Sequence, residues 1–264
     1  MLLPAGDFAH GLWDLAHHRH GPLADIPGWW VPYCVIYDWL VGAFLVFWGG
    51  DGMRLSEFLA GQLRKPSGWF GRLVMGRFFN KVNDHINQLT IERLNIQSTD
   101  HVLDIGFGGG FTIPRMASLA HAGKVCGVDF SEAMVRQAER RFHRLIEQGK
   151  VEVQLGDLAS LPYKDGAFDK VCTVNTLYFW PNPVQNLAEI RRVMKHDGRL
   201  VVAFRSREKM KPMRKFLHDL RLYSPNEVRE LLEQAGFRNV RLEKYDEDKR
   251  LDAILAIGSA RAAF

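Results

Sequence analysis

Short apolar runs alternate with amphipathic stretches through the middle of the chain. Apolar runs of strand length occupy residues 102–107, 124–130 and 151–155, and apolar residues recur at helical spacing in 113–120 and 131–148 between them. Strands that alternate with helices are typical of a parallel β-sheet covered by helices on both faces. The pattern therefore predicts an α/β fold.

The alternation continues towards the carboxyl terminus. Residues 168–175 and 198–204 are predicted to form two further strands, with a helix over 182–195 between them and a turn at 196–198. These elements extend the same sheet.

The last predicted elements break the alternation. A helix is expected over 224–236, with Ser224 as its N-cap and Glu227 three residues on, as in a capping box. Residues 238–245 and 251–260 then form two strands without a helix between them, which predicts a hairpin at the sheet edge.

Two different compositions are joined near residue 52. The first 52 residues contain five Asp, one Arg and no Lys or Glu, so their net charge is −4. Because the whole chain carries +5, the other 212 residues carry +9. From 55 to 94 apolar residues recur at helical spacing, interrupted by a turn signal at 65–68, which predicts two helices. We therefore divide the chain into an N-terminal segment 1–52, a helical lid 53–99 and an α/β domain 100–264.

An apolar run, residues 39–50, lies in the N-terminal segment. A membrane-spanning helix needs roughly 20 apolar residues, and Asp38 and Pro32 stop a backward extension of this run. Two interpretations stay open: the run is a hydrophobic anchor, or residues 1–52 are translated upstream sequence and Met53 is the natural start. We expect the second, because the composition changes here and the glycines just before Met53 require guanine-rich codons typical of a ribosome-binding site.

Composition excludes several other classes of protein. The chain is 47% hydrophobic and 25% charged, as in a globular protein, and Cys34, Cys126 and Cys172 have no CxxC spacing. This indicates a reducing, cytoplasmic compartment without a disulfide framework or zinc site.

Four histidines between residues 10 and 20 lack carboxylates or thiolates at ligand spacing, so no metal is predicted. The pI of about 9.1 would suit an anionic partner. However, no basic stripe interleaved with aromatics stands out, so nucleic acid is not expected.

A glycine cluster follows the first predicted strand. This strand carries Asp104 and ends in Gly106–Gly110, which leads directly into a helix. A P-loop would need a lysine after the glycines, and a dinucleotide fingerprint would need glycine where Phe111 stands. A tight turn without a ligand is the remaining alternative.

Carboxylates also follow the next two strands. Asp129 ends the second strand, where an acidic side chain can accept hydrogen bonds from ribose hydroxyls, and Asp157 follows the third. Three acidic residues at successive strand ends would repel phosphates. A cationic nucleoside without phosphate, carrying an amino-acid tail, would suit this edge of the sheet.

The motifs D-x-G-x-G-x-G at 104–110, Asp129, G-D-L at 156–158 and VNTLYFW at 174–180 occur in one order and spacing. In this they closely resemble class I S-adenosylmethionine-dependent methyltransferases, especially UbiE-like small-molecule enzymes. The resemblance covers the chain from about residue 70 to the carboxyl terminus. It implies a Rossmann-like sheet of seven strands with the last antiparallel, and S-adenosyl-L-methionine as the cofactor.

The resemblance also implies cofactor-binding residues. They are Asp104, Gly106, Phe107, Gly108, Gly110, Asp129, Phe130, Met134, Asp157, Leu158 and Asn175. Asp104 and the glycine loop would approach the methionine moiety, Asp129 would hold the ribose, and Asn175 would face the methionine and methyl end. Phe130 and Met134 would flank the adenine, with simple core packing as the alternative. Asp157 would accept from the adenine amino group and the Leu158 backbone would reach a ring nitrogen, unless Asp157 only caps a turn.

Methyl transfer from a sulfonium is an in-line displacement that depends mainly on alignment, so a dedicated catalytic residue is not required. Where a base helps, the candidates near the expected pocket rim are Tyr178, Arg205, His218 and Tyr223, each with a packing or surface role as its alternative. The stretch Asn175–Tyr178 lacks both prolines of the N-P-P-Y motif of adenine- and glutamine-methylating enzymes, and no Pro-Cys dipeptide is present. These departures disfavour nucleobase acceptors.

The helical lid and the segment 205–223 are expected to choose a small-molecule acceptor, lipid-like or aromatic. The stretch 55–81 is apolar and basic, which would allow peripheral contact with an anionic membrane; an ordinary basic helix face is the alternative. Two rival functions stay open, a nucleic-acid methyltransferase and a cofactor-binding module without catalysis.

Overall fold

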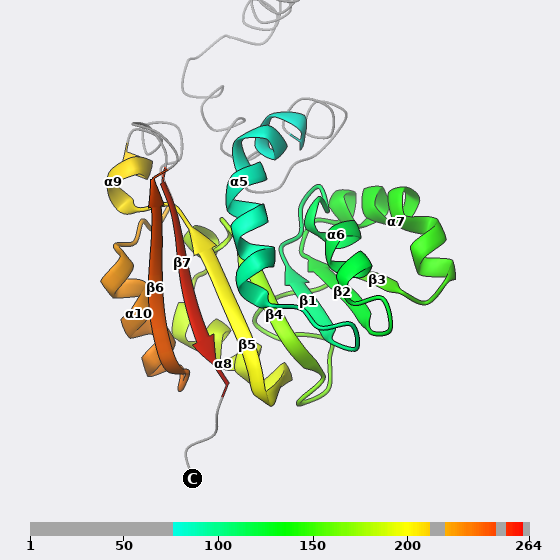
Figure 1. Ribbon diagram of the computed structural model, residues 1–264. Helices are drawn as coiled ribbons and strands as arrows, with labels where there is room; N and C mark the ends of the chain where they lie inside the picture. Colours follow the sequence, from blue (N-terminus) through cyan, green and yellow to red (C-terminus); the bar gives the residue numbers. More distant parts are fainter. Residues whose placement is uncertain (1–75, 212–219, 247–251, 261–264) are drawn as a thin grey trace, which may run out of the picture. The chain divides into compact units, whose positions relative to one another are not determined.

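A seven-stranded β-sheet forms the centre of the computed structural model, which describes residues 76–211, 220–246 and 252–260 (Figure 1). The strand order is β3-β2-β1-β4-β5-β7-β6. Strands β1 to β5 pair in parallel, whereas β7 is antiparallel to both β5 and β6. The predicted sheet with an antiparallel last strand and a terminal hairpin is therefore confirmed. The strands are β1 His101–Ile105, β2 Lys124–Asp129, β3 Val151–Leu155, β4 Phe168–Val174, β5 Met194–Phe204, β6 Arg238–Asp246 and β7 Asp252–Ser259.

Helices cover both faces of the sheet, which explains why the strands β1 and β2 read as nearly continuous apolar runs. Leu103 and Ile105 of β1 pack into a core with α8 and α10, whereas Val102 packs on the opposite face with α5, α6 and α7. Figure 1 shows the same two layers. The helices are α5 Gly76–Leu94, α6 Thr112–Leu119, α7 Glu132–Glu147, the 3₁₀ turn η2 Leu177–Phe179, α8 Pro183–Val193, α9 Arg207–Met210 and α10 Pro225–Gln234.

Strand β5 begins earlier than the sequence pattern predicts. The helical periodicity extends to residue 195, but α8 ends at Val193 and Met194 already pairs with Phe168 of β4. The register shifts between Phe168 and Lys170, so an irregular stretch of β5 takes the place of the predicted helix end at 194–195 and of the predicted turn at 196–198.

The start of α10 follows the predicted capping box. The Ser224 side chain accepts a hydrogen bond from the Glu227 backbone N–H, and the Glu227 carboxylate accepts one from the Ser224 N–H at 2.7 Å. Two of the N–H groups that lack a partner within the helix are thereby satisfied.

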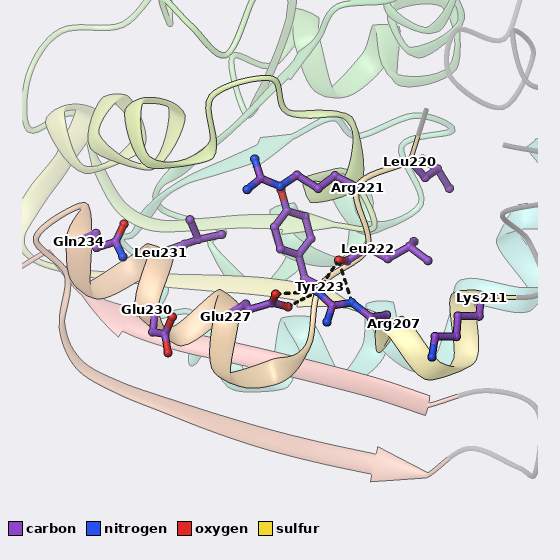
Figure 2. A pocket seen from close by; sticks show the side chains of 10 residues that line it. All are labelled: Arg207, Lys211, Leu220, Arg221, Leu222, Tyr223, Glu227, Glu230, Leu231 and Gln234. Carbon is purple, nitrogen blue, oxygen red and sulfur yellow. Dashed lines mark hydrogen bonds and ion pairs between the residues drawn. The ribbon is translucent and has the colours of Figure 1, made fainter. Parts of the chain in front are cut away.

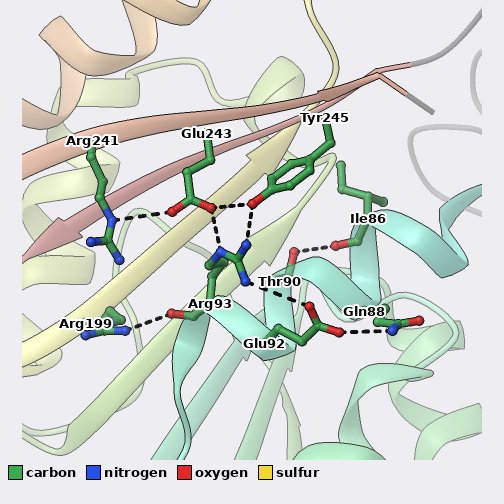
Figure 3. A network of polar contacts seen from close by, with 9 residues as sticks. All are labelled: Ile86, Gln88, Thr90, Glu92, Arg93, Arg199, Arg241, Glu243 and Tyr245. Carbon is green, nitrogen blue, oxygen red and sulfur yellow. Dashed lines mark hydrogen bonds and ion pairs between the residues drawn. The ribbon is translucent and has the colours of Figure 1, made fainter. Parts of the chain in front are cut away.

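Helix α5 packs across one face of the sheet, and hydrogen bonds hold its carboxyl end in place (Figure 3). Arg93 donates hydrogen bonds to the Glu243 carboxylate and the Tyr245 hydroxyl of β6, both at 2.5 Å. The Arg93 carbonyl oxygen accepts a bond from Arg199 of β5 at 3.1 Å. Residues 150 positions apart in sequence thus hold the helix against the far half of the sheet.

Several predictions fall outside the described residues. They concern the segment 1–52, the apolar run and histidines within it, the start at Met53, the first lid helix and the basic side chains of 54–81. In the ranges that the structure does cover, no helix is long and apolar enough to cross a membrane.

Candidate cofactor site

The turn after β1 is built from glycines in the left-handed region. Gly106, Gly108 and Gly110 have φ values of 68°, 51° and 68°, a conformation that only glycine adopts readily. The Gly106 N–H donates to the Val128 carbonyl of β2 at 2.7 Å, and the Gly110 N–H donates to Phe107 at 2.8 Å. The loop is therefore a fixed turn that is bonded to the end of the neighbouring strand.

The three glycines have different surroundings. A Cβ at Gly106 would lie 2.5 Å from Thr176 Cγ2, and one at Gly110 would lie 2.7 Å from Phe142, so both positions need glycine for packing. A Cβ at Gly108 would meet nothing within 4 Å. Gly108 is thus the point of the loop where the backbone borders open space and a ligand can approach it closely. Phe107, by contrast, is buried in the core formed with α6 and α7.

Asp104 lies beneath this loop and is only 3% exposed. Its carboxylate accepts hydrogen bonds from the Thr112 hydroxyl of α6 and from the Cys172 thiol of β4, the latter at 3.6 Å. Burial raises the pKa of Asp104 to about 6, although both hydrogen bonds oppose the shift. Asp104 can therefore respond to a nearby positive charge by releasing a proton near neutral pH.

Asp129, at the end of β2, connects its strand to the loop. One carboxylate oxygen accepts from the Gly108 N–H at 2.9 Å, and the other accepts from the Ser131 N–H at 2.8 Å. Burial raises its pKa. Because a carboxylate oxygen can accept more than one hydrogen bond, both oxygens keep capacity for ribose hydroxyls.

An apolar surface lies beside Asp129. Phe130 is 47% exposed, and Leu155, which pairs with Asp129 in the sheet, is 53% exposed. Such a surface fits the flat face of a nucleobase. Leu155 is not among the predicted residues, and its only signal in the sequence is its position as the apolar last residue of β3. Met134 is only 5% exposed and packs in the core, in agreement with the alternative of simple core packing.

Asp157 and Leu158 follow β3 at the same edge. The exposed Asp157 side chain accepts from the Ala159 N–H at 2.9 Å and its carbonyl accepts from Ser160 at 3.0 Å, as a turn cap would. Leu158 is half-buried against the core. The predicted adenine contacts of both residues stay predictions.

Asn175 follows β4, next to β1, where the strand order changes direction and ligands bind in open α/β sheets. Its φ of 57° is left-handed, which asparagine tolerates better than most residues. Its side-chain amide nitrogen donates to Asn83 Oδ1 of α5 at 3.0 Å. No local pattern in the sequence indicates Asn83, because this contact depends on how α5 packs on the sheet.

Two of the proposed acceptor-side residues are buried and hydrogen-bonded within the protein. The Tyr178 hydroxyl accepts from the Arg205 N–H at 2.6 Å and lies 3.1 Å from the Arg205 carbonyl. Burial raises the pKa of Tyr178, which opposes a role as a base. The buried Arg205 donates to the carbonyl of Asp252 at 2.7 Å. Tyr178 and Arg205 were expected near the pocket rim, but they are only 3% and 4% exposed, and their role towards the acceptor stays a prediction. His218 lies outside the described residues.

Tyr223 lines a cavity of about 550 Å³ between α9, the chain before α10, and α10 itself (Figure 2). Arg207 also lines this cavity. It forms an ion pair with Glu227 at 2.5 Å and donates a hydrogen bond to the Leu222 carbonyl at 3.1 Å. None of the predicted cofactor residues lines this cavity. It is therefore separate from the glycine loop and adjoins the proposed acceptor segment.

Metal-ligating side chains do not gather in the part of the chain that the structure covers, where no group of three His, Cys, Asp or Glu could hold an ion. Cys126 and Cys172 are free and buried. Burial raises the pKa of the Cys126 thiol to about 12.

Comparison with known proteins agrees with this geometry. A family model described as a methyltransferase domain matches residues 103–202. The chain is 29% identical over 190 residues to a demethylmenaquinone methyltransferase of Lactiplantibacillus plantarum, covering 61% of this chain and 80% of the relative. It is 39% identical over 113 residues to an uncharacterized 37.1 kDa protein in a transposon of Streptomyces fradiae, covering 42% of this chain. The chain spans only 32% of that second relative's length.

Among solved structures, an S-adenosylmethionine-dependent methyltransferase from Aquifex aeolicus is similar with a TM-score of 0.54 and 25% identity, over 65% of this chain and 88% of that chain. The matched residues 103–202 run from β1 to β5 and contain the glycine loop, Asp129 and Asn175. Residues 103–202 therefore match a methyltransferase domain, and this part of the chain is similar to S-adenosylmethionine-dependent methyltransferases, which implies S-adenosylmethionine as the cofactor.

Proposed function

We propose that this protein transfers the methyl group of S-adenosylmethionine to a small-molecule acceptor. The observation that carries the proposal is the bond between the Gly108 N–H and Asp129. It holds a loop whose backbone borders open space next to a carboxylate that can still accept hydrogen bonds. A nucleoside with an amino-acid tail fits such an edge, with its ribose at Asp129 and its tail towards the loop.

The bound cofactor supplies a methyl carbon attached to a positively charged sulfur. The chain's own residues then have to hold that carbon in line with the acceptor atom and exclude water, which is the larger part of catalysis in such a displacement. Asp129 and the glycine loop would fix one end of the cofactor, and the exposed Phe130 and Leu155 would take the base. We propose no general base, because Tyr178 is buried with its hydroxyl engaged.

For the acceptor we propose a small molecule of lipid-like or aromatic kind. The name of the Lactiplantibacillus plantarum relative supports a small-molecule acceptor. Asn175-Thr176-Leu177-Tyr178 lacks the two prolines of nucleobase-methylating enzymes, which further supports this choice. Tyr223 remains an acceptor-side candidate, since it lines a cavity beside the segment that follows β5.

Calorimetric titration of the full chain tests the cofactor assignment. S-adenosylmethionine and S-adenosylhomocysteine should bind, whereas NAD should not, because the carboxylates at the strand ends would repel its pyrophosphate. Tighter binding of NAD than of S-adenosylhomocysteine would overturn the assignment. A screen of candidate acceptors for release of S-adenosylhomocysteine then separates an enzyme from a binding module, because a module binds the cofactor without turnover.

A further inference from the structure

One side-chain hydrogen bond connects helix α5 to the carboxyl edge of the sheet at the predicted methyl end of the cofactor. The amide nitrogen of Asn175 donates to Asn83 Oδ1 at 3.0 Å. The Asn175 backbone is fixed by its left-handed φ of 57° and by its own N–H, which donates to the Ala203 carbonyl at 2.9 Å. Rotation of the side-chain amide is therefore the main freedom left to this residue.

The carbonyl oxygen of the Asn175 side-chain amide makes only a long hydrogen bond. Its carbonyl oxygen lies 3.4 Å from the Tyr178 hydroxyl, a long distance for a hydrogen bond. That hydroxyl has a single proton and a nearer acceptor, the Arg205 carbonyl at 3.1 Å. An amide oxygen carries two lone pairs. Asn175 Oδ1 therefore keeps the capacity to accept a bond from a stronger donor.

We infer that Asn83 is a positioning residue for the amino-acid end of the cofactor. Asn83 Oδ1 accepts from the Asn175 NH₂ group and so keeps that group towards α5, which leaves the Asn175 oxygen for the cofactor's ammonium group. Without an acceptor at position 83, the Asn175 amide can turn over and present its NH₂ to the ammonium. Two donors would then face each other. The inference rests on the proposed function, since it assumes a cofactor with a methionine moiety.

Two ligands separate positioning from general stability. S-adenosylhomocysteine contains the amino-acid tail, whereas 5′-methylthioadenosine keeps the nucleoside and lacks the tail. Asn83→Ala should weaken S-adenosylhomocysteine binding about tenfold, the scale of one hydrogen bond to a charged group, and leave 5′-methylthioadenosine binding within about twofold. Both affinities are measured by calorimetry on the full chain.

Two further variants sharpen the test. Asn83→Asp offers acceptor oxygens only and should keep S-adenosylhomocysteine binding within about threefold of the parent. Asn87→Ala is the matched control, since Asn87 lies one turn further along α5 and is also partly buried. It should bind both ligands as the parent does.

The inference is wrong if Asn83→Ala binds S-adenosylhomocysteine as tightly as the parent, or loses affinity for both ligands equally. It is also wrong if Asn83→Asp loses as much as Asn83→Ala. Failure of the parent chain itself to bind S-adenosylhomocysteine would instead reject the proposed function, so the two outcomes are distinguishable.

Discussion

Asp104 shows how burial sets the chemistry of a single residue at this site. Its neighbours Thr112 and Cys172 donate hydrogen bonds to it, yet burial raises its pKa from 3.8 to about 6. In the free protein the ionised form therefore lowers stability by its full cost above about pH 6, and that cost is relieved as the pH falls from about 6 to 3.8. A sulfonium or ammonium group nearby reverses this preference, because it stabilises the ionised carboxylate.

Binding of S-adenosylmethionine should therefore depend on pH. Where binding requires ionised Asp104, the affinity should rise about tenfold between pH 5 and pH 7, as one group with a pKa near 6 titrates. Calorimetry at several pH values measures this, and circular dichroism shows that the fold persists. The Asp104→Asn variant cannot titrate and should give a flat profile. A flat profile for the parent would contradict the role of Asp104.

Site residues that belong to the sequence motifs could be predicted, whereas residues that contact them from other parts of the chain could not. Gly108 and Asp129 could be named because the spacing from β1 to β2 places them at one edge of the sheet, and the bond between them agrees. Asn83 contacts Asn175 across 92 positions, so no local pattern indicates it. Tyr178 was placed at a pocket rim because sequence position alone does not show that its hydroxyl faces the Arg205 backbone.

The element scale explains why the fold was the more predictable part. Each strand from β1 to β4 is a short apolar run. The helices α6, between β1 and β2, and α7, between β2 and β3, fix parallel connections, whereas β3 and β4 are joined by a segment without a helix. Periodicity could not find the start of β5, because Met194 fits an apolar helical face and a strand equally well. Its pairing with Phe168 decides the outcome.

Helix α10 allows a direct test of a sequence-predicted element. Ser224→Ala removes the side chain that accepts from the Glu227 N–H and should lower the free energy of unfolding by about 1 kcal/mol. Chemical denaturation measures the change. Asn226→Ala, in the same first turn and exposed, is the control and should change stability by less than about 0.5 kcal/mol. Equal effects of the two variants would show that the capping box contributes no stability.

At the scale of the whole molecule, the net charge of +5 conceals many local pairings. Arg192 lies against Glu189 and Asp165 at 2.7 and 2.6 Å, and Lys124 pairs with Glu152 at 2.6 Å. Arg207 and Arg93 are likewise paired with carboxylates. Cations that are individually neutralised do not form the continuous stripe that phosphate backbones select.

The protein should therefore bind nucleic acid only weakly. Fluorescence anisotropy with a labelled single-stranded RNA and a DNA duplex should show dissociation constants no tighter than about 1 μM at physiological salt, the range of non-specific binding. Between about 50 and 200 mM salt this binding should disappear, because it depends on released counterions. S-adenosylhomocysteine affinity should stay nearly constant over the same range, since the proposed contacts are with buried groups such as Asp129. Nanomolar binding of either nucleic acid that persists at 200 mM salt would favour a nucleic-acid methyltransferase over the small-molecule enzyme.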